Sequence, residues 1–88
     1  MKGFVQDPNA TLDYTVDWNL WLDGDTISTS VWVVESPLVN EADSNTITTT
    51  NIFISGGVHG ENYVLTNSIS TVSGRSDDRS IELRVRNR

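Results

Sequence analysis

The chain has 88 residues, of which 36% are hydrophobic, and it carries a formal net charge of −6. This length allows one compact domain and leaves no room for a catalytic domain beside a cofactor domain. The sequence has no cysteine, which excludes disulfides and thiolate sites, and no apolar run long enough to span a bilayer. We expect a single domain over residues 1–88, without a signal peptide at residues 1–10 and therefore made in a cytoplasm.

Charge is distributed unevenly along the chain. Residues 1–70 hold nine acidic residues and one basic residue, whereas residues 71–88 hold five arginines and three acidic residues. Binding to phosphate backbones depends on several Lys or Arg side chains, so the first 70 residues argue against nucleic-acid binding. We interpret the acidic surface as a source of solubility.

Strict alternation of side chains predicts three strands that are buried on one face. The inward positions of these strands are, in chain order, Leu12, Tyr14, Val16 and Trp18; then Tyr63, Leu65, Asn67, Ile69 and Thr71; and finally Ile81, Leu83 and Val85. Residues 25–34, 46–50 and 51–55 are rich in β-branched side chains, which also favours strands. No stretch shows helical periodicity.

Turn-forming residues recur about every 8 to 12 positions, as in all-β sandwiches and barrels. They are Asp23-Gly24, Ser36-Pro37, residues 40–45, Gly56-Gly57 and Ser73-Gly74. The pattern predicts an all-β fold, an immunoglobulin-like antiparallel β-sandwich of six or seven strands, with a small barrel as the alternative. Tyr63 stands where such sandwiches often tie a tyrosine hydroxyl to upstream backbone, although a merely packed ring fits equally well.

The sequence offers no catalytic, metal or cofactor site. The single imidazole, His59, lies in a glycine-rich loop, and we interpret it as solvated because no nucleophile and orienting acid can be assigned to it. Residues 23–25 and 77–78 contain carboxylates that could bind calcium, but they lack the spacing of a calcium loop. We interpret both as turns, the second with a local ion pair to Arg79, and we expect that the protein is not an enzyme.

The segment Val31-Trp32-Val33-Val34 is apolar on both faces of a predicted strand. If Trp32 and Val34 point into the core, Val31 and Val33 point outward, where a partner subunit could bury them. The alternative is that these valines only supply β-propensity at solvated positions.

A second apolar cluster ends the first alternating strand. Residues 18–22 contain four large apolar side chains, and at least one, Trp21 or Leu20, must face away from so small a core. Exposed tryptophan is a common anchor of protein interfaces, so Trp21 is a candidate partner contact. Covering the open end of the sandwich is the alternative.

Three arginines, Arg84, Arg86 and Arg88, fall on one face of the last predicted strand. They could pair with carboxylates such as Asp13 and Asp17, on a neighbouring strand or on a second copy. An acidic body with a basic edge suits head-to-tail association. A solvated basic face is the alternative.

Two segments of the chain resemble those of a known family. They are Asp17-Trp18-x-x-Trp21-Leu22 and the run Gly74-Arg75-Ser76-Asp77-Asp78-Arg79-Ser80, supported by residues 24–27, residues 55–57 and Gly60. Over residues 4–88 the sequence resembles small immunoglobulin-like bacteriophage virion proteins described as fibre-to-tail adaptors. The resemblance implies a non-enzymatic tail or neck component, made in the bacterial host cytoplasm and present in several copies on a ring of virion proteins. The acidic loop predicted at residues 40–45 departs from that family.

The sequence thus favours a virion adaptor that buries Val31, Val33 and Trp21 and pairs its terminal arginines with acidic partners. It implies a homo-oligomer or several copies among tail, neck or fibre components, with no nucleic acid, membrane or cofactor. One alternative is a free-standing binding module for a glycan or protein ligand. Its contacts would be Trp21, Asn40, Asn45 and His59. Another alternative is a capsid cement or decoration protein.

Overall fold

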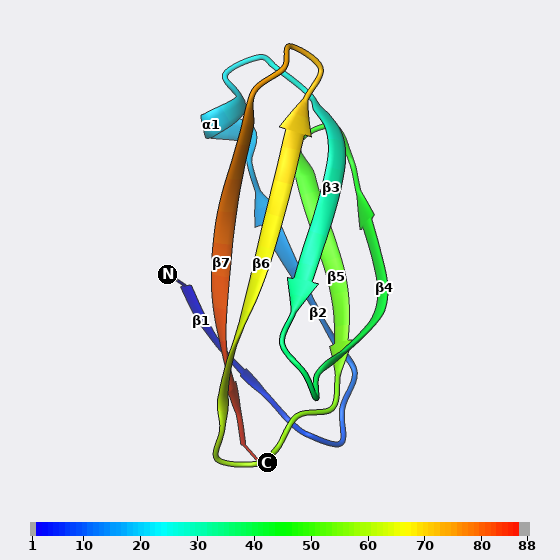
Figure 1. Ribbon diagram of the computed structural model, residues 1–88, viewed down its shortest axis with the longest axis vertical. Coiled ribbons are helices and arrows are strands. Elements are labelled where there is room, and N and C mark those ends of the chain that lie inside the picture. Colours follow the sequence, from blue (N-terminus) through cyan, green and yellow to red (C-terminus); the bar gives the residue numbers. More distant parts are fainter. Residues whose placement is uncertain (1, 87–88) are drawn as a thin grey trace.

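Two β-sheets pack face to face in the computed structural model, which describes residues 2–86 (Figure 1). The elements are β1 (Lys2–Gln6), β2 (Leu12–Asp17), α1 (Asn19–Leu22), β3 (Ile27–Val34), β4 (Val39–Asn45), β5 (Thr49–Ser55), β6 (Asn62–Thr71) and β7 (Ser76–Val85). One sheet has the strand order β1-β7-β6-β3 and the other has the order β2-β5-β4. The predicted all-β, immunoglobulin-like sandwich is confirmed. Its strand pairs are antiparallel except β1 and β7, which run parallel.

The three alternating segments form β2, β6 and β7 as predicted, because each places its apolar positions between the sheets. Leu65 and Leu83 are fully buried in the four-stranded sheet, and Ile52 and Ile54 of β5 are fully buried opposite them. The fully buried Trp18, directly after β2, adds one of the two buried indole rings of this core. The core therefore lies along the whole length of an elongated molecule, 42 Å in its longest dimension.

Four local predictions are wrong. Residues 40–45 belong to the edge strand β4 rather than to a loop, and residues 46–48 form a turn before the single strand β5. β4 is exposed along its whole length, so it carries no apolar alternation to reveal it. Residues 77–78 pair with β6 inside β7 and form no turn. Residues 19–22 form a single helical turn, which is too short to show a 3.6-residue period.

A buried amide, that of Asn67 on β6, joins the two sheets. Its Oδ1 accepts hydrogen bonds from Trp18 Nε1 at 3.0 Å and from Thr50 Oγ1 at 2.7 Å, both on the opposite layer. Its Nδ2 donates to Ser30 Oγ at 3.0 Å and to the carbonyl oxygen of Val31 at 3.2 Å within its own sheet. Every hydrogen-bonding position of this fully buried side chain is used, so the network fixes the relative placement of β2, β5, β6 and β3.

The loop between β5 and β6 is fixed by two features that the sequence indicated. The Tyr63 hydroxyl accepts a hydrogen bond from the backbone N–H of Val58 at 3.1 Å, so this tyrosine does tie back to upstream backbone. Gly57 has a φ of +95°, and a Cβ there would lie 2.7 Å from Val85 Cγ2. Gly56 also has a positive φ, of +84°, as suits a pair of turn-forming glycines, and at Gly57 close packing also requires glycine.

Replacing Gly57 tests how tightly this loop packs on the end of β7. Gly57→Ala should lower the free energy of unfolding by about 2–4 kcal/mol, because positive φ and overpacking against Val85 both oppose the new methyl group. Gly60→Ala is the matched control, since Gly60 has a φ of +92° and open space around its Cβ position. It should lower the same quantity by about 1–2 kcal/mol, and equal losses in urea unfolding would contradict the close contact.

Replacing Asn67 tests the link between the sheets. Asn67→Leu should lower the free energy of unfolding by about 2–4 kcal/mol, because it leaves the buried N–H of Trp18 and hydroxyl of Thr50 without their acceptor. The matched control is Asn51→Leu, since the Asn51 amide donates to Thr15 Oγ1 at 2.8 Å on the solvent face of β5. The control should change stability by less than about 1 kcal/mol in urea unfolding, and similar losses for both variants would show that the Asn67 network contributes little.

Candidate protein-binding surfaces

The outer face of the four-stranded sheet exposes two valines of β3, an edge strand of that sheet, at alternate positions of the strand. Val31 is 57% exposed and Val33 is 60% exposed, whereas Trp32 is buried on the inner face. The sequence predicted these orientations only on the condition that Trp32 points into the core, and the structure meets that condition. In register, Val31 pairs with Ser68 and Val33 with Thr66 of β6, so the valines stand beside short polar side chains. Val31 and Val33 thus form an apolar strip, the valine strip, on a face to which the neighbouring part of β6 contributes no bulky side chain.

The end of the molecule that carries α1 presents a different apolar surface (Figure 1). Leu20 is 93% exposed, so it is the side chain of this cluster that faces away from the core. Trp21 is only partly exposed: its ring contacts that of Trp18 edge-on, with 5.4 Å between centroids, and the Arg75 guanidinium lies 4.3 Å from the Trp21 ring. Trp21 therefore covers the end of the sandwich, and Leu20 is the projecting group that sequence reasoning placed second.

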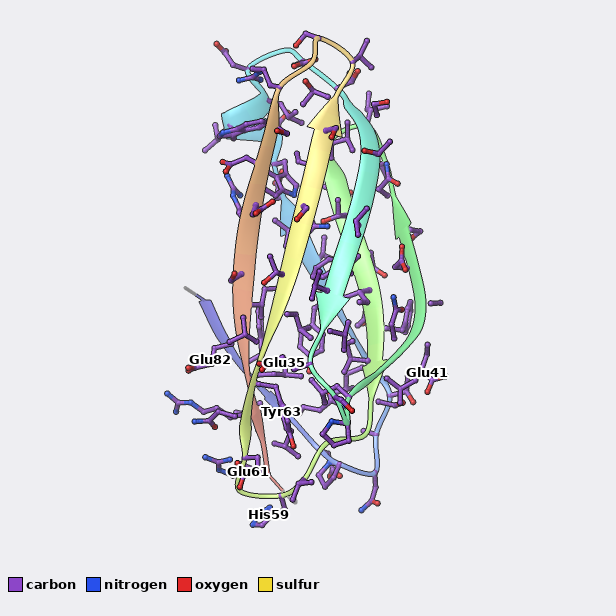
Figure 2. The ribbon with its side chains drawn as sticks, viewed as in Figure 1. Glu35, Glu41, His59, Glu61, Tyr63 and Glu82 are labelled. Carbon is purple, nitrogen blue, oxygen red and sulfur yellow. The ribbon has the colours of Figure 1, made fainter. Side chains whose placement is uncertain are left out.

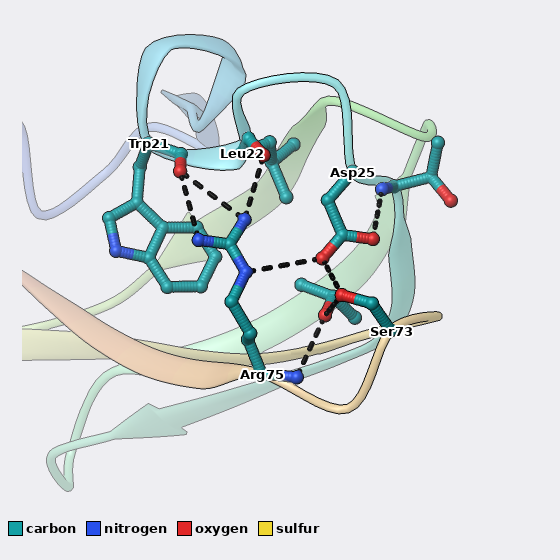
Figure 3. A network of polar contacts seen from close by, with 7 residues as sticks. Trp21, Leu22, Asp25, Ser73 and Arg75 are labelled. Carbon is teal, nitrogen blue, oxygen red and sulfur yellow. Dashed lines mark hydrogen bonds and ion pairs between the residues drawn. The ribbon is translucent and has the colours of Figure 1, made fainter.

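A polar network fixes α1 against the turn between β6 and β7 (Figure 3). Arg75 Nε lies 3.3 Å from Asp25 Oδ2, and Arg75 Nη2 donates to the carbonyl oxygen of Leu22 at 2.7 Å. The Ser73 hydroxyl also donates to Asp25 Oδ2. The pKa of Asp25 is held well below its ordinary value, chiefly by this bond from Ser73. Further bonds from the Thr71 hydroxyl, the Thr26 amide and Arg75 lower it in the same direction. The Asp25 carboxylate, one of those considered for calcium, thus serves as a hydrogen-bond acceptor within the fold.

The arginines near the C-terminus are only partly arranged as predicted. Arg84 is exposed, and its Nε lies 3.8 Å from Glu82 Oε1, while Arg86 is partly buried and donates to the adjacent carbonyl of Val85. Arg88 lies outside the described residues. The predicted pairing of Arg84 and Arg86 with acids of β2 within the chain is wrong, because β1, not β2, lies beside this part of β7.

The residues considered for catalysis or for a ligand do not converge. His59 is exposed at the end opposite α1, as Figures 1 and 2 show. Trp21 therefore lies at the other end of the molecule from His59, and Asn40 and Asn45 lie near opposite ends of β4. The four residues named for a glycan or protein ligand form no common site. Between residues 2 and 86, no three His, Cys, Asp or Glu side chains are grouped so that they could hold a metal ion.

The described part of the chain has no helix of the length and apolar character that crossing a membrane requires.

The sequence comparison decides the family. Residues 6–84 match the family described as "Podophage GP4 fiber-tail adaptor protein gp77". The chain belongs to this family. The resemblance inferred from the residue segments around Trp18 and Asp77 is therefore confirmed, and it places the chain among phage tail adaptor proteins. No curated protein matches the chain.

A solved structure supports the fold of this fibre-tail adaptor family member. The solution structure of the PKD domain from the KIAA 1837 protein is similar, with a TM-score of 0.52. The two chains are 13% identical, and the similarity covers 98% of this chain and 79% of that one. At this identity the likeness shows an immunoglobulin-like fold and nothing about binding.

The structural role of two arginines, Arg75 and Arg79, was missed by sequence reasoning. The local ion pair expected between Arg79 and residues 77–78 does not form among the described residues. Arg79 resembles Arg75 in stacking on a tryptophan, with its guanidinium 4.3 Å from the ring of Trp18, and it donates to the carbonyl oxygen of Asp17 at 2.9 Å. Both arginines and both tryptophans belong to the two segments that carry the family resemblance. That coincidence could have indicated that the segments contact each other, since arginine often stacks on aromatic rings.

The low pKa of Asp25 makes stability depend on pH. Because folding lowers this pKa, the carboxylate stabilises the fold above its unfolded-state pKa of about 3.9, and the stabilisation is lost as pH falls through the lower, folded-state value. Wild-type melting temperature should therefore fall more steeply below about pH 4 than that of Asp25→Asn, which should already be less stable at pH 7. Ser73→Ala should give an intermediate slope, and parallel curves for all three proteins would contradict this assignment.

Proposed function

We propose that the protein joins a fibre component to the tail of a podophage virion by binding different neighbours through separate surfaces. Membership of the fibre-tail adaptor family supports the general role. The observation that carries the proposal at residue level is the exposed pair Val31 and Val33 on an otherwise small and polar face of β6 and β3. The role is structural rather than catalytic.

The valine strip suits a protein contact because its side chains are already ordered by the sheet. Both valines are β-branched and have little rotamer freedom, so burying them orders few additional torsions. Full burial of a Val side chain contributes about 1.5 kcal/mol or more, and these two are more than half exposed. A flat apolar strip of this kind is expected to contribute roughly tenfold to affinity rather than to hold a partner by itself.

A second neighbour could be held at the ends of the molecule. Leu20 projects from the α1 end, with Trp21 partly exposed beside it, whereas Arg84 and Arg86 lie toward the end of β7. In Figure 1 these two regions occupy opposite ends of the long axis. An apolar end and a basic end allow one partner to be recognised by burial and another by its carboxylates. Several copies docked on a ring of tail proteins would present the same surfaces repeatedly.

Isosteric replacement of the valine strip tests the proposal. The double variant Val31→Thr, Val33→Thr should weaken binding to either the purified fibre protein or the purified tail protein of the same phage about tenfold. The fold should be unchanged, because threonine is β-branched and both side chains face solvent. Surface plasmon resonance against each immobilised protein measures the effect.

The matched control is Val58→Thr, Val72→Thr, which changes two valines that are 53% and 72% exposed in turns outside this face. The control variant should bind like wild type. The proposal fails if wild-type protein binds neither immobilised protein, or if the strip variant binds both as tightly as the control does.

A further inference from the structure

The four-stranded sheet has one edge that is only half covered. β7 has ten residues and β1 has five, and β1 pairs with residues 81–85 of β7. Within the described chain, residues 76–80 of β7 pair with β6 on one side and with no strand on the other. About 16 Å of strand edge, at roughly 3.3 Å per residue, thus continues the line of β1 without a neighbouring strand. On this stretch the Asp78 N–H donates to Asp77 Oδ1 at 2.8 Å, a bond that an added strand would replace.

A groove of about 530 Å³ lies beside this free edge. It is lined by Phe4 of β1, by residues 15–17 of β2 and by residues 79–81 of β7. β2 is itself an edge strand of the other sheet, so strand edges form both walls of the groove. Phe4, Val16 and Ile81 give it an apolar part that can accept a side chain.

Arg79 supplies the groove with an unneutralised cation. Its guanidinium stacks on Trp18 and donates one hydrogen bond to a backbone carbonyl, that of Asp17. Arg75 and Arg84 each have a carboxylate within ion-pair distance, but among residues 2–86 Arg79 has none. A partly buried guanidinium with several unused N–H donors favours a carboxylate from outside the chain.

We propose that an extended segment of a virion partner adds a strand along residues 76–80 of β7 and places alternate side chains in this groove. This inference rests on the proposed adaptor function and adds the chemistry of one partner. Backbone hydrogen bonds to the free edge provide affinity, as in other cases of strand addition. The segment continues on β7 the pairing that β1 makes along residues 81–85.

The side chains of β7 define what this segment must carry. Ile81, Arg79 and Asp77 occupy alternate positions and so share the inner face of the strand. Lys2 of β1 already pairs opposite Ile81, so the added segment lies beyond it, and an Asp or Glu of that segment fits at the level of Arg79. A second acid two residues further would meet Asp77 and is disfavoured. The expected pattern is acidic, any residue, and then neutral or basic.

Site-specific photocrosslinking tests the position of the partner. A benzophenone amino acid in place of Thr15, which lines the groove, should attach the fibre protein or the tail protein when the assembly is irradiated, and the attached peptide should contain the expected pattern. The same amino acid in place of Ser44, on the exposed edge strand β4, should not attach that peptide. Attachment of a second copy of this chain alone, or of no partner peptide by an assembled complex, would overturn the inference.

A charge exchange then tests the role of Arg79. Arg79→Glu should weaken binding of the crosslinked segment, made as a synthetic peptide, at least tenfold in isothermal titration calorimetry. A peptide with Lys at the acidic position should bind Arg79→Glu better than it binds wild type, a result that misfolding cannot produce. Absence of this rescue overturns the role of Arg79.

The two proposals can fail separately. If the wild-type chain binds the fibre and tail proteins while the Thr15 crosslink and the Arg79 exchange give nothing, strand addition is wrong and the adaptor role stands.

Discussion

The arrangement of the molecule depends on one buried polar link between its two sheets. Asn67 accepts hydrogen bonds from Trp18 and Thr50 of one layer and donates to Ser30 and Val31 of its own layer. A chain of this size buries a small core, so apolar packing alone leaves the relative placement of two sheets weakly specified. A fully satisfied buried amide adds direction to that packing, because a shifted sheet would leave several polar groups unpaired. The network also fixes β3, which carries the exposed valine pair.

The small size of the core also explains which surfaces remain available to partners. Each strand of the sandwich has one face inward, so the apolar residues of β3 in excess of that requirement must face solvent, as Val31 and Val33 do. β1 is too short to cover β7, so the edge beside Arg79 stays free. The proposed adaptor function gives these surfaces a use, since a protein that joins two components contacts neighbours on more than one side. Surfaces that would be liabilities in a free monomer are suitable contacts in an assembled tail.

Sequence patterns were sufficient to predict strands in which burial alternates along the chain, and insufficient where burial does not alternate. β2, β6 and β7 could be predicted because inward and outward residues alternate. The direction of Val31 and Val33 could not be predicted, because the segment around them is apolar on both faces. β4 could not, because an edge strand that is exposed on both faces has no alternation. The exchange of roles between Leu20 and Trp21 depends on a single helical turn and on the distant Arg75, which stacks on the tryptophan. Contacts between residues so far apart in the sequence leave no local pattern.

The central claim is that the Asn67 network fixes the two sheets against each other, while β3 and residues 76–80 of β7 are left to be covered by other proteins. Amide hydrogen exchange, followed by mass spectrometry in the free chain and in its complex with fibre and tail proteins, tests this claim most directly. The account predicts that β5 and β6 are protected in both states, whereas β3 and residues 76–80 gain protection only in the complex. Equal protection of β3 and residues 76–80 in the two states would contradict it.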